Sequence, residues 1–403
     1  MVVAATAGLT RPFWVYQGFD EQVHYSIVAM VARSWPHPVL SGYASWSGPM
    51  VYWLLAGLSR PFGTTLVSGR IIVAVMSWLT CVTAYVVFRD RLGARAWMAL
   101  ALAAMLGLSP FFFGQSFRLL TDNPTWLFVL LALERLLAYV AEPRLRRFAA
   151  FAAFAAVATL MRQTSVWLFL PGLMAPFCVP LSARDRARAA ALVVAGLVPL
   201  AALLVSWGGL LPSGAVQAGS GMFRLRDACL SLAVVGLWGL LLVPADEARA
   251  LSAKLGSTGL VAVVGATVLG LLAMAGGAMA SLRGGDPYGI GLLGRVGQAW
   301  WRVLGTSLVW WIFVPLGAAT LAALVVTRWR RPADRVLIVA LVAIVLSTAA
   351  STTWYERYVD FAVLFLLGGL VASGGSRVRP VDVLRWSGVV AISLLWTVMV
   401  ARA

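Results

Sequence analysis

The sequence predicts an all-α protein that crosses a membrane many times. Its 403 residues are 61% hydrophobic and only 12% charged, with a mean hydropathy of +0.88. Apolar runs of membrane-spanning length recur along the whole chain, and no soluble core needs so many of them. The net charge of +17 comes from short arginine clusters between these runs. It therefore indicates membrane topology and attraction to anionic lipid, and nucleic acid is not an expected partner.

About twelve membrane spans are expected, because roughly 17 to 25 apolar residues cross a bilayer. Basic clusters occur in every second connection between the spans, so the positive-inside rule places those connections in the cytoplasm. The rare acidic residues gather in the other connections, on the outer side. We expect one integral membrane domain over 1–403, with a long outer loop at 11–64 and a transmembrane bundle at 65–401. The expected spans lie near 65–88, 96–113, 123–141, 148–161, 164–181, 189–211, 227–245, 256–280, 303–327, 336–353, 359–375 and 384–401.

The long outer loop contains two apolar segments of helical length, at 21–34 and 49–60. The second is too short to span, so both are predicted to be helices that lie at the membrane interface. Residues 1–19 are interrupted by Arg11 and Pro12 and cannot span as written. Either the true start lies upstream, or a stub helix tilts in from the outer face.

The stretch GFDEQVHY places Asp20, Glu21 and His24 in this outer loop. If a helix begins here, Asp20 is its natural N-cap and shares a helical face with His24 at i, i+4 spacing. Two interpretations remain open from the residues alone. The pair is either a cap with solvated charge, or a carboxylate placed to take a proton from a hydroxyl at the membrane surface.

Two further outer stretches carry charge at the ends of apolar runs. In RLLTDNPTW, Thr121 or Asp122 can cap a helix whose first turn contains Pro124. In LMRQTSVW, Arg162 and Gln163 separate two apolar runs with almost no loop between them. An arginine there is either a snorkelling anchor or a guanidinium fork that holds a phosphate group.

The stretch TWYERYVDF places Glu356, Arg357 and Asp360 at another outer helix start, where an exposed ion-pair cluster is the simplest interpretation. No nucleotide-binding, metalloprotease or paired-cysteine motif occurs, so no cofactor is expected. The three cysteines lie far apart in sequence, and neither a disulfide framework nor a metal-ligand spacing follows from them.

Taken together, these stretches resemble the polytopic alpha-1,2-glucosyltransferases that add the last glucose to the lipid-linked N-glycan precursor from dolichyl-phosphate glucose. The resemblance covers residues 15–370 and includes the motif RQTSVW at 162–167. This chain departs from the family in a missing or truncated first membrane helix, a shorter middle and a reduced aromatic segment, so the acceptor stays open. The other matching motifs are the acidic DE-x-x-H of Asp20, Glu21 and His24, the loop SWSGPMVYWL at 45–54, Thr121 with Asp122, the Gly-Gly loop at 205–214 and ERYVDF at 356–361.

The resemblance implies a GT-C glycosyltransferase, a helical bundle whose active site opens to the outer side of the membrane. The richness in alanine, glycine and arginine indicates a GC-rich bacterial genome, so we expect a bacterial inner-membrane protein whose site faces the periplasm or cell exterior. The resemblance also implies a polyprenyl-phosphate hexose donor, with glucose as the sugar, and a hydroxyl acceptor on a lipid-linked or cell-envelope glycan. A metal is not required, although Asp20 and Asp122 can bind one if they converge. The implied roles are Asp20 as base with Glu21 as helper, donor phosphate binding by Arg162, Arg357 and His24, and substrate binding by Asp122, Gln163, Trp46 and Glu356.

A transporter or flippase is the competing interpretation, and its best support is Glu134 inside the apolar run 123–141. Such a protein should show ionisable residues at mid-bilayer and repeated interrupted helices, whereas the charges here gather at one face. We expect Glu134 to pair with Arg135 or with a neighbouring helix. A non-catalytic scaffold does not need the acidic residues of the first outer loop.

Overall fold

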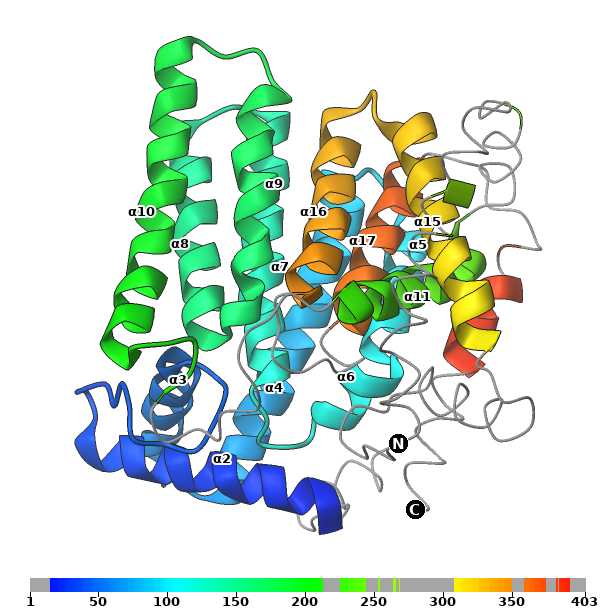
Figure 1. Ribbon diagram of the computed structural model, residues 1–403. Helices are drawn as coiled ribbons and strands as arrows, with labels where there is room; N and C mark the ends of the chain where they lie inside the picture. The colour runs from blue at the N-terminus through cyan, green and yellow to red at the C-terminus, as the bar shows by residue number, and fades with distance from the viewer. Residues whose placement is uncertain are drawn as a thin grey trace. The chain divides into compact units, whose positions relative to one another are not determined.

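The computed structural model describes residues 15–212, 225–243, 308–349, 359–374 and 384–391, with a few isolated positions between them. Within these ranges every regular element is helical (Figure 1). The chain divides into two compact units, which are described separately. Unit 1 consists of Met1–Val87, Gly107–Gln217 and Ser393–Ala403, and unit 2 consists of Phe88–Leu106 and Ala218–Ile392. The single domain expected over 1–403 stays a prediction.

Five of the described helices are long and apolar enough to cross a membrane, which confirms an all-α integral membrane protein. Their chain positions agree with five of the expected spans. The expected span at 256–280, and most of the one at 384–401, fall outside the described residues. The five spanning helices are Leu66–Arg91, Asp122–Ala141, Ala183–Trp207, Trp311–Arg328 and Pro332–Ala349.

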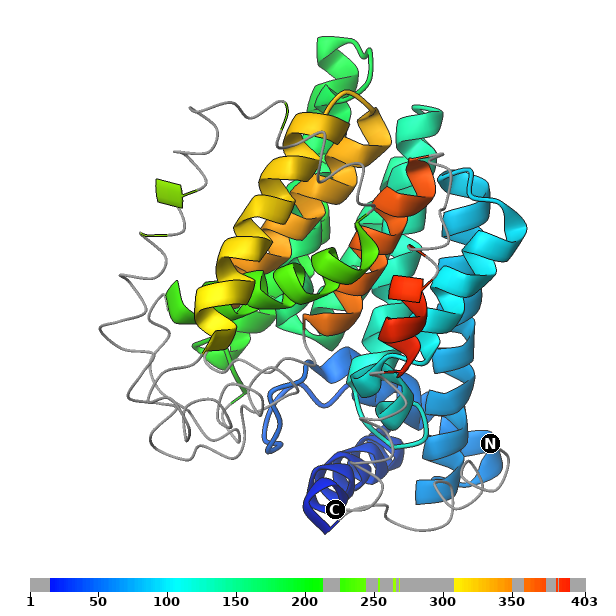
Figure 2. The same ribbon diagram turned by 90° about the vertical axis from the view of Figure 1, so that its right-hand side faces the viewer.

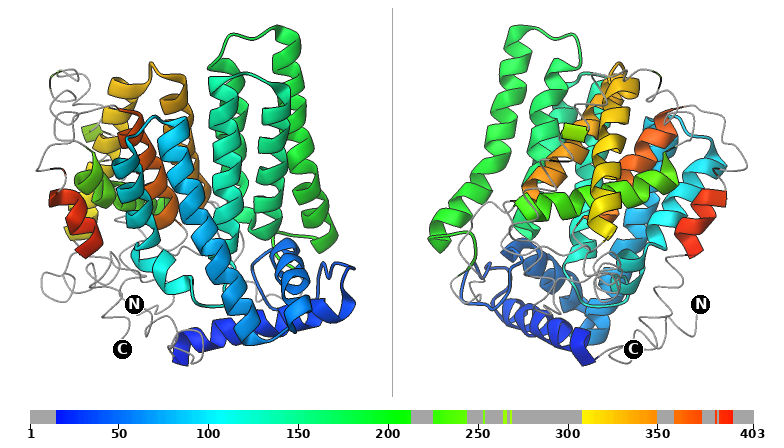
Figure 3. Two further views of the ribbon diagram at one scale, coloured as in Figure 1. Left: turned by 180° about the vertical axis from the view of Figure 1, so that it is seen from behind. Right: turned by 45° about the vertical axis from the view of Figure 1, so that its right-hand side comes forward.

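Unit 1 is built from eight α-helices among its described residues, together with short 3-10 segments. The antiparallel pair α7 and α8 forms its centre, with α4 packed on α7 and α10 packed on α8 (Figure 3). Helix α2 runs crosswise at the ends of these helices, and α3 lies between α2 and the end of α8 (Figure 1). The bounds are α2 (Val15–Ser34), α3 (Pro49–Ser59), α4 (Leu66–Val86), α6 (Pro110–Gln115), α7 (Asp122–Ala141), α8 (Leu145–Met161), α9 (Phe169–Met174) and α10 (Ala183–Trp207).

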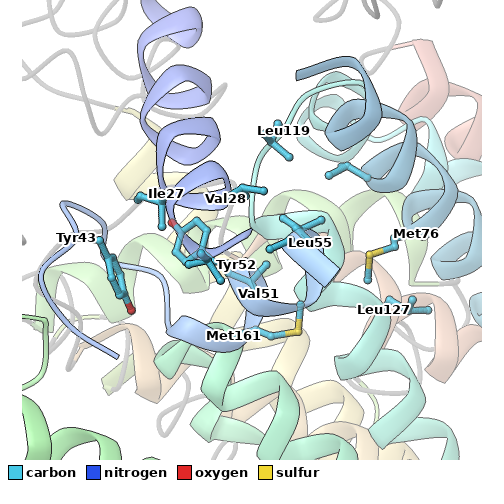
Figure 4. Packing of buried hydrophobic residues seen from close by; sticks show 13 residues of the cluster. Ile27, Val28, Tyr43, Val51, Tyr52, Leu55, Met76, Leu119, Leu127 and Met161 are labelled. Atoms are coloured by element: carbon cyan, nitrogen blue, oxygen red, sulfur yellow. The ribbon is translucent and has the colours of Figure 1, made fainter. Parts of the chain in front are cut away.

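The two helices expected at the interface are present as α2 and α3, and a shared apolar cluster holds them to the bundle. Figure 4 shows Val51 and Leu55 of α3 packed between Val28 of α2 and Met161 at the end of α8. These side chains are almost fully buried. Burial of each such valine or leucine contributes about 1.5–3 kcal/mol to the free energy of folding relative to exposure in water. Helices α2 and α3 are therefore stably packed on the bundle.

Two expected spans are interrupted in the structure. The apolar run at 164–181 forms a 3-10 segment (Gln163–Leu168), then α9, then a second 3-10 segment (Ala175–Phe177). Pro171 and Pro176 supply no amide hydrogen, which prevents a continuous α-helical ladder. The run at 96–113 likewise divides, because α5 (Ala96–Gly107) ends before Pro110 begins α6.

Unit 2 packs α11 (Leu225–Leu242) against α15 (Leu308–Arg328), α16 (Pro332–Ala349) and α17 (Asp360–Ser373), as Figure 2 shows. A Cβ added to Gly236 would lie 2.1 Å from the Phe313 carbonyl oxygen, so glycine permits the close approach of α11 and α15. Two polar contacts involve aspartates of this unit. Trp238 Nε1 donates to Asp360 Oδ1 over 2.6 Å, and Ser373 Oγ donates to Asp334 Oδ1 over 2.5 Å.

Candidate active site at the ends of α2, α3, α7 and α8

Asp20 lies within helix α2, which begins five residues earlier at Val15. The interpretation of Asp20 as an N-cap is therefore wrong, because the helix start that it would cap is elsewhere. Its position one turn before His24 places both side chains on the same helical face, as the i, i+4 spacing predicts. Both residues are partly exposed, whereas the next residue, Glu21, is buried.

The hydroxyl of Tyr52 in α3 contacts His24 on this face of α2, and Tyr52 is completely buried. His24 Nδ1 lies 2.7 Å from Tyr52 Oη, which in turn donates to Ser45 Oγ over 2.6 Å. Burial raises the pKa of Tyr52 well above its usual range, so the phenol stays protonated. The positive charge of Arg162 opposes this rise in pKa, and the negative charge of Asp20 adds to it.

The segment Ser45–Gly48 links this phenol to the ends of α7 and α8. Ser47 Oγ shares a 2.7 Å hydrogen bond with Thr121 Oγ1, next to the start of α7. The Gly48 amide donates to the Met161 carbonyl over 2.8 Å, at the last residue of α8. A Cβ on Gly48 would lie 2.0 Å from the Leu160 carbonyl oxygen, so only glycine allows this approach.

Asp122 and Arg162 form a largely buried ion pair between the start of α7 and the end of α8. Arg162 leaves the helix with extended backbone angles (φ −146°, ψ 119°), which turns its side chain back toward Asp122. The expected cap at the start of α7 is absent: Thr121 occupies the N-cap position without a side-chain capping bond. Its hydroxyl contacts Ser47 and the Asp122 carboxylate contacts Arg162, because both side chains have tertiary partners.

Gln163 follows Arg162 directly and begins a 3-10 segment. Its Nε2 atom is buried and makes no hydrogen bond to any residue that the structure describes. A buried amide donor without a partner is costly, so it is suited to a ligand oxygen such as a sugar hydroxyl. Trp46 lies half-buried in the linking segment, between the two serines that contact Tyr52 and Thr121.

Glu21 faces away from this site and binds Arg70 of α4. Its two carboxylate oxygens accept from Arg70 Nε and an Nη over 2.7 and 2.5 Å, and Oε1 also accepts from the Leu119 amide over 2.8 Å. Nearby Arg118 is also buried, which lowers its pKa to about 10 and leaves it charged at neutral pH. With both oxygens of Glu21 held in this way, we assign it to structural support, instead of the helper role expected from the sequence.

Features of the sequence point to Arg70 and Tyr52, although neither is among the predicted site residues. Arg70 is the sole charged residue within the apolar α4, and such a residue usually has a buried partner. Tyr52 belongs to the aromatic SWSGPMVYWL loop, but its contact with His24 depends on the packing of α3 against α2.

Arg357 and Glu356 lie outside the described residues. Asp360 lies in unit 2, where it accepts from Trp238. Glu134 is buried in α7 and forms the expected ion pair with Arg135, with 2.8 Å between Oε2 and Nε. Over the described ranges, no three His, Cys, Asp or Glu side chains gather as a metal site would require.

Residues 46–207 match the protein family described as dolichyl-phosphate-mannose-protein mannosyltransferase. This stretch is less than half of the chain, and it includes residues 46–48 of the linking segment, α7, the Asp122–Arg162 pair and α10. The match supports the class of GT-C membrane glycosyltransferases for this chain. No curated protein sequence matches it.

Solved structures resemble the chain only distantly. The protein O-mannosyltransferase Pmt1–Pmt2 complex of S. cerevisiae has 17% identity and a TM-score of 0.36, over 51% of this chain and 35% of that one. Oligosaccharyltransferase AglB from Archaeoglobus fulgidus has 13% identity and a TM-score of 0.45, over 95% of this chain and 51% of that one. ArnT from Cupriavidus metallidurans has 16% identity and a TM-score of 0.41, over 92% and 77% of the two chains.

This chain therefore spans about a third of the Pmt chain and about half of the AglB chain. Likenesses at these scores assign no role to any residue.

Proposed function

We propose that this protein is a membrane glycosyltransferase that moves a hexose, glucose, from a polyprenyl-phosphate sugar to a hydroxyl group. The acceptor is a lipid-linked or cell-envelope glycan on the outer side of a bacterial inner membrane. One observation carries the proposal: Tyr52 and the segment Ser45–Gly48 connect His24, one helical turn after Asp20, to the ends of α7 and α8 where Asp122 and Arg162 pair. The family match over residues 46–207 supports the same reaction class.

Asp20 is the base of the proposed transfer. Its carboxylate takes the proton of the acceptor hydroxyl while that oxygen attacks the anomeric carbon of the donor sugar. The bond from the anomeric carbon to the phosphate oxygen breaks, and the polyprenyl phosphate leaves with the bonding electrons. A single displacement of this kind inverts the anomeric centre and requires one base.

Arg162 stabilises the phosphate as its negative charge grows, because a guanidinium fork matches phosphate oxygens well. Asp122 is buried against Arg162 and fixes its direction. His24 is a second phosphate ligand. Gln163 Nε2, which has no hydrogen-bond partner among the described residues, donates to a sugar hydroxyl. Trp46 adds an aromatic face for the sugar, while Arg357 and Glu356 stay candidates for the donor phosphate and the substrate.

The test is transfer of radiolabelled sugar from undecaprenyl-phosphate glucose, mannose or galactose to membrane glycolipids, in membranes that contain equal amounts of each variant. We expect Asp20→Asn to lower transfer roughly 10²- to 10⁴-fold, which is the range for loss of a general base. Arg162→Ala should lower it about 100-fold or more. Glu142→Gln is the matched control, since Glu142 is an exposed carboxylate at the opposite end of α7.

Full activity in Asp20→Asn would overturn the assignment of the base. If the wild type makes no product with any donor, the transferase is wrong and transport assays on Glu134 variants follow. A product from mannose or galactose alone would retain the transferase and correct the sugar.

A further inference from the structure

The hydroxyl of Tyr52 lies close to Ser45, Ser47 and His24 but has only one hydrogen to donate. It donates to Ser45 Oγ over 2.6 Å, and it lies 2.7 Å from His24 Nδ1. With its hydrogen directed to Ser45, the phenol oxygen offers His24 only a lone pair. The hydrogen of the second contact must then come from the imidazole, so Nδ1 carries a proton.

We infer that Tyr52 is a positioning residue that holds His24 in the Nδ1–H tautomer. A hydrogen bond at one imidazole nitrogen fixes which of the two nitrogens carries the hydrogen of the neutral ring. Here Nε2 carries the lone pair of the neutral ring, or the second proton of the imidazolium. The two rings also stack, with centroids 5.8 Å apart and planes inclined by 30°, which resists rotation of the imidazole.

Three features make the phenol a fixed hydrogen-bond acceptor. Burial raises the pKa of Tyr52, so it does not ionise near neutral pH and keeps its single hydrogen. Tyr43 packs edge-on against its ring, with centroids 5.5 Å apart. Ser45 Oγ also accepts from the Ser47 amide over 3.1 Å, so the serine that receives the phenol hydrogen is itself held in place.

The consequence for catalysis rests on the proposed function. In the Nδ1–H tautomer, only Nε2 of His24 changes its protonation, so this nitrogen donates to the donor phosphate when the ring is charged. Without the Tyr52 hydroxyl, the hydrogen bond that fixes the hydrogen on Nδ1 is lost, so the contact of Nε2 with the phosphate is weakened. Tyr52→Phe should therefore lower kcat for sugar transfer several-fold, with a smaller effect on KM for the acceptor.

The tautomer can be measured directly, because the chain has only two histidines, His24 and His37. His37 is exposed, so His37→Gln leaves one imidazole signal from a protein labelled with 15N-histidine. Nitrogen chemical shifts of the purified full chain, above the pH at which His24 loses its second proton, distinguish Nδ1–H from Nε2–H. We expect Nδ1–H.

Two variants should change this tautomer by different routes. Tyr52→Phe removes the acceptor of the Nδ1 hydrogen. Ser45→Ala removes the acceptor of the phenol hydrogen, which frees Tyr52 to donate to Nδ1 and thereby places the imidazole hydrogen on Nε2. Tyr43→Phe is the control, because its hydroxyl donates to the Ser47 carbonyl and should leave His24 unchanged.

An Nε2–H signal in the wild type, or Nδ1–H retained in both variants, would overturn the inference. If Tyr52→Phe fails to fold, Ser45→Ala still provides the test. Absence of sugar transfer alongside the expected nitrogen shifts would count against the proposed function and leave the tautomer assignment standing.

Discussion

The neighbours Asp20 and Glu21 show how one helix gives two adjacent acids different environments. Successive helical residues point about 100° apart, so one carboxylate faces the partly exposed side of α2 while the other faces α4. Glu21 and Arg70 form a bidentate pair whose side chains are only 3% and 2% exposed. The sequence shows the acidic pair but not this division, since it depends on which face of α2 meets the bundle.

Glu21→Gln should destabilise the protein by about 3–5 kcal/mol, because it leaves the Arg70 charge buried without its counterion. The control Glu142→Gln removes an exposed carboxylate and should change stability by about 0–1 kcal/mol. Thermal unfolding in detergent, followed by loss of the folded peak in gel filtration, measures both. Equal midpoints for the two variants would contradict a structural role of the buried pair.

The Asp122–Arg162 pair predicts coupled effects on sugar transfer. Arg162→Lys keeps the charge but loses the planar fork, so transfer should fall about 10- to 100-fold. Asp122→Asn should lower it less, because Arg162 keeps its charge and loses only its orientation. The double variant Asp122→Asn with Arg162→Ala should be no worse than Arg162→Ala alone. If the double variant instead lost activity by the product of the two single-variant factors, Asp122 would not act through Arg162.

At the scale of elements, the contacts made by segment 45–48 are the feature of unit 1 that the sequence predicts least. Apolar runs gave α4, α7, α8 and α10 nearly at their observed positions, because hydrophobic length is a property of each run alone. The convergence of Tyr52, Thr121 and Met161 on this segment depends on tertiary packing instead. A Ser-Gly-Pro sequence indicates a turn but does not show which helix ends the turn will touch.

Gly48→Ala tests whether this segment sets the site. The added Cβ would lie 2.0 Å from the Leu160 carbonyl oxygen, so the segment must move away from the end of α8. We expect a loss of about 1–3 kcal/mol in stability, as for overpacking, together with lower sugar transfer. Gly209→Ala is the control, since no atom of the described residues lies within 4 Å of its added Cβ. Equal behaviour of the two variants would argue against the close approach at Gly48.

At the scale of the whole molecule, the hairpin of α7 and α8 relates the candidate site to the membrane. The 20 residues of α7 extend about 30 Å, the thickness of a bilayer core. Asp122 and Arg162 lie at one end of the hairpin, and the turn with Glu142, Arg144 and Arg147 lies at the other. A basic turn favours the cytoplasm, so the paired site residues should lie on the outer side.

Cysteine labelling tests this orientation. In bacterial spheroplasts, a membrane-impermeant maleimide should label Gln22→Cys, on the exposed face of α2, and should label Arg146→Cys only after the membrane is permeabilised. The wild type sets the background, because Cys178 and Cys229 are buried and Cys81 is half-buried. The reverse pattern would place α2 on the cytoplasmic side. A lipid-linked sugar presented at the outer surface would then be out of its reach, even with the same residues gathered around Tyr52.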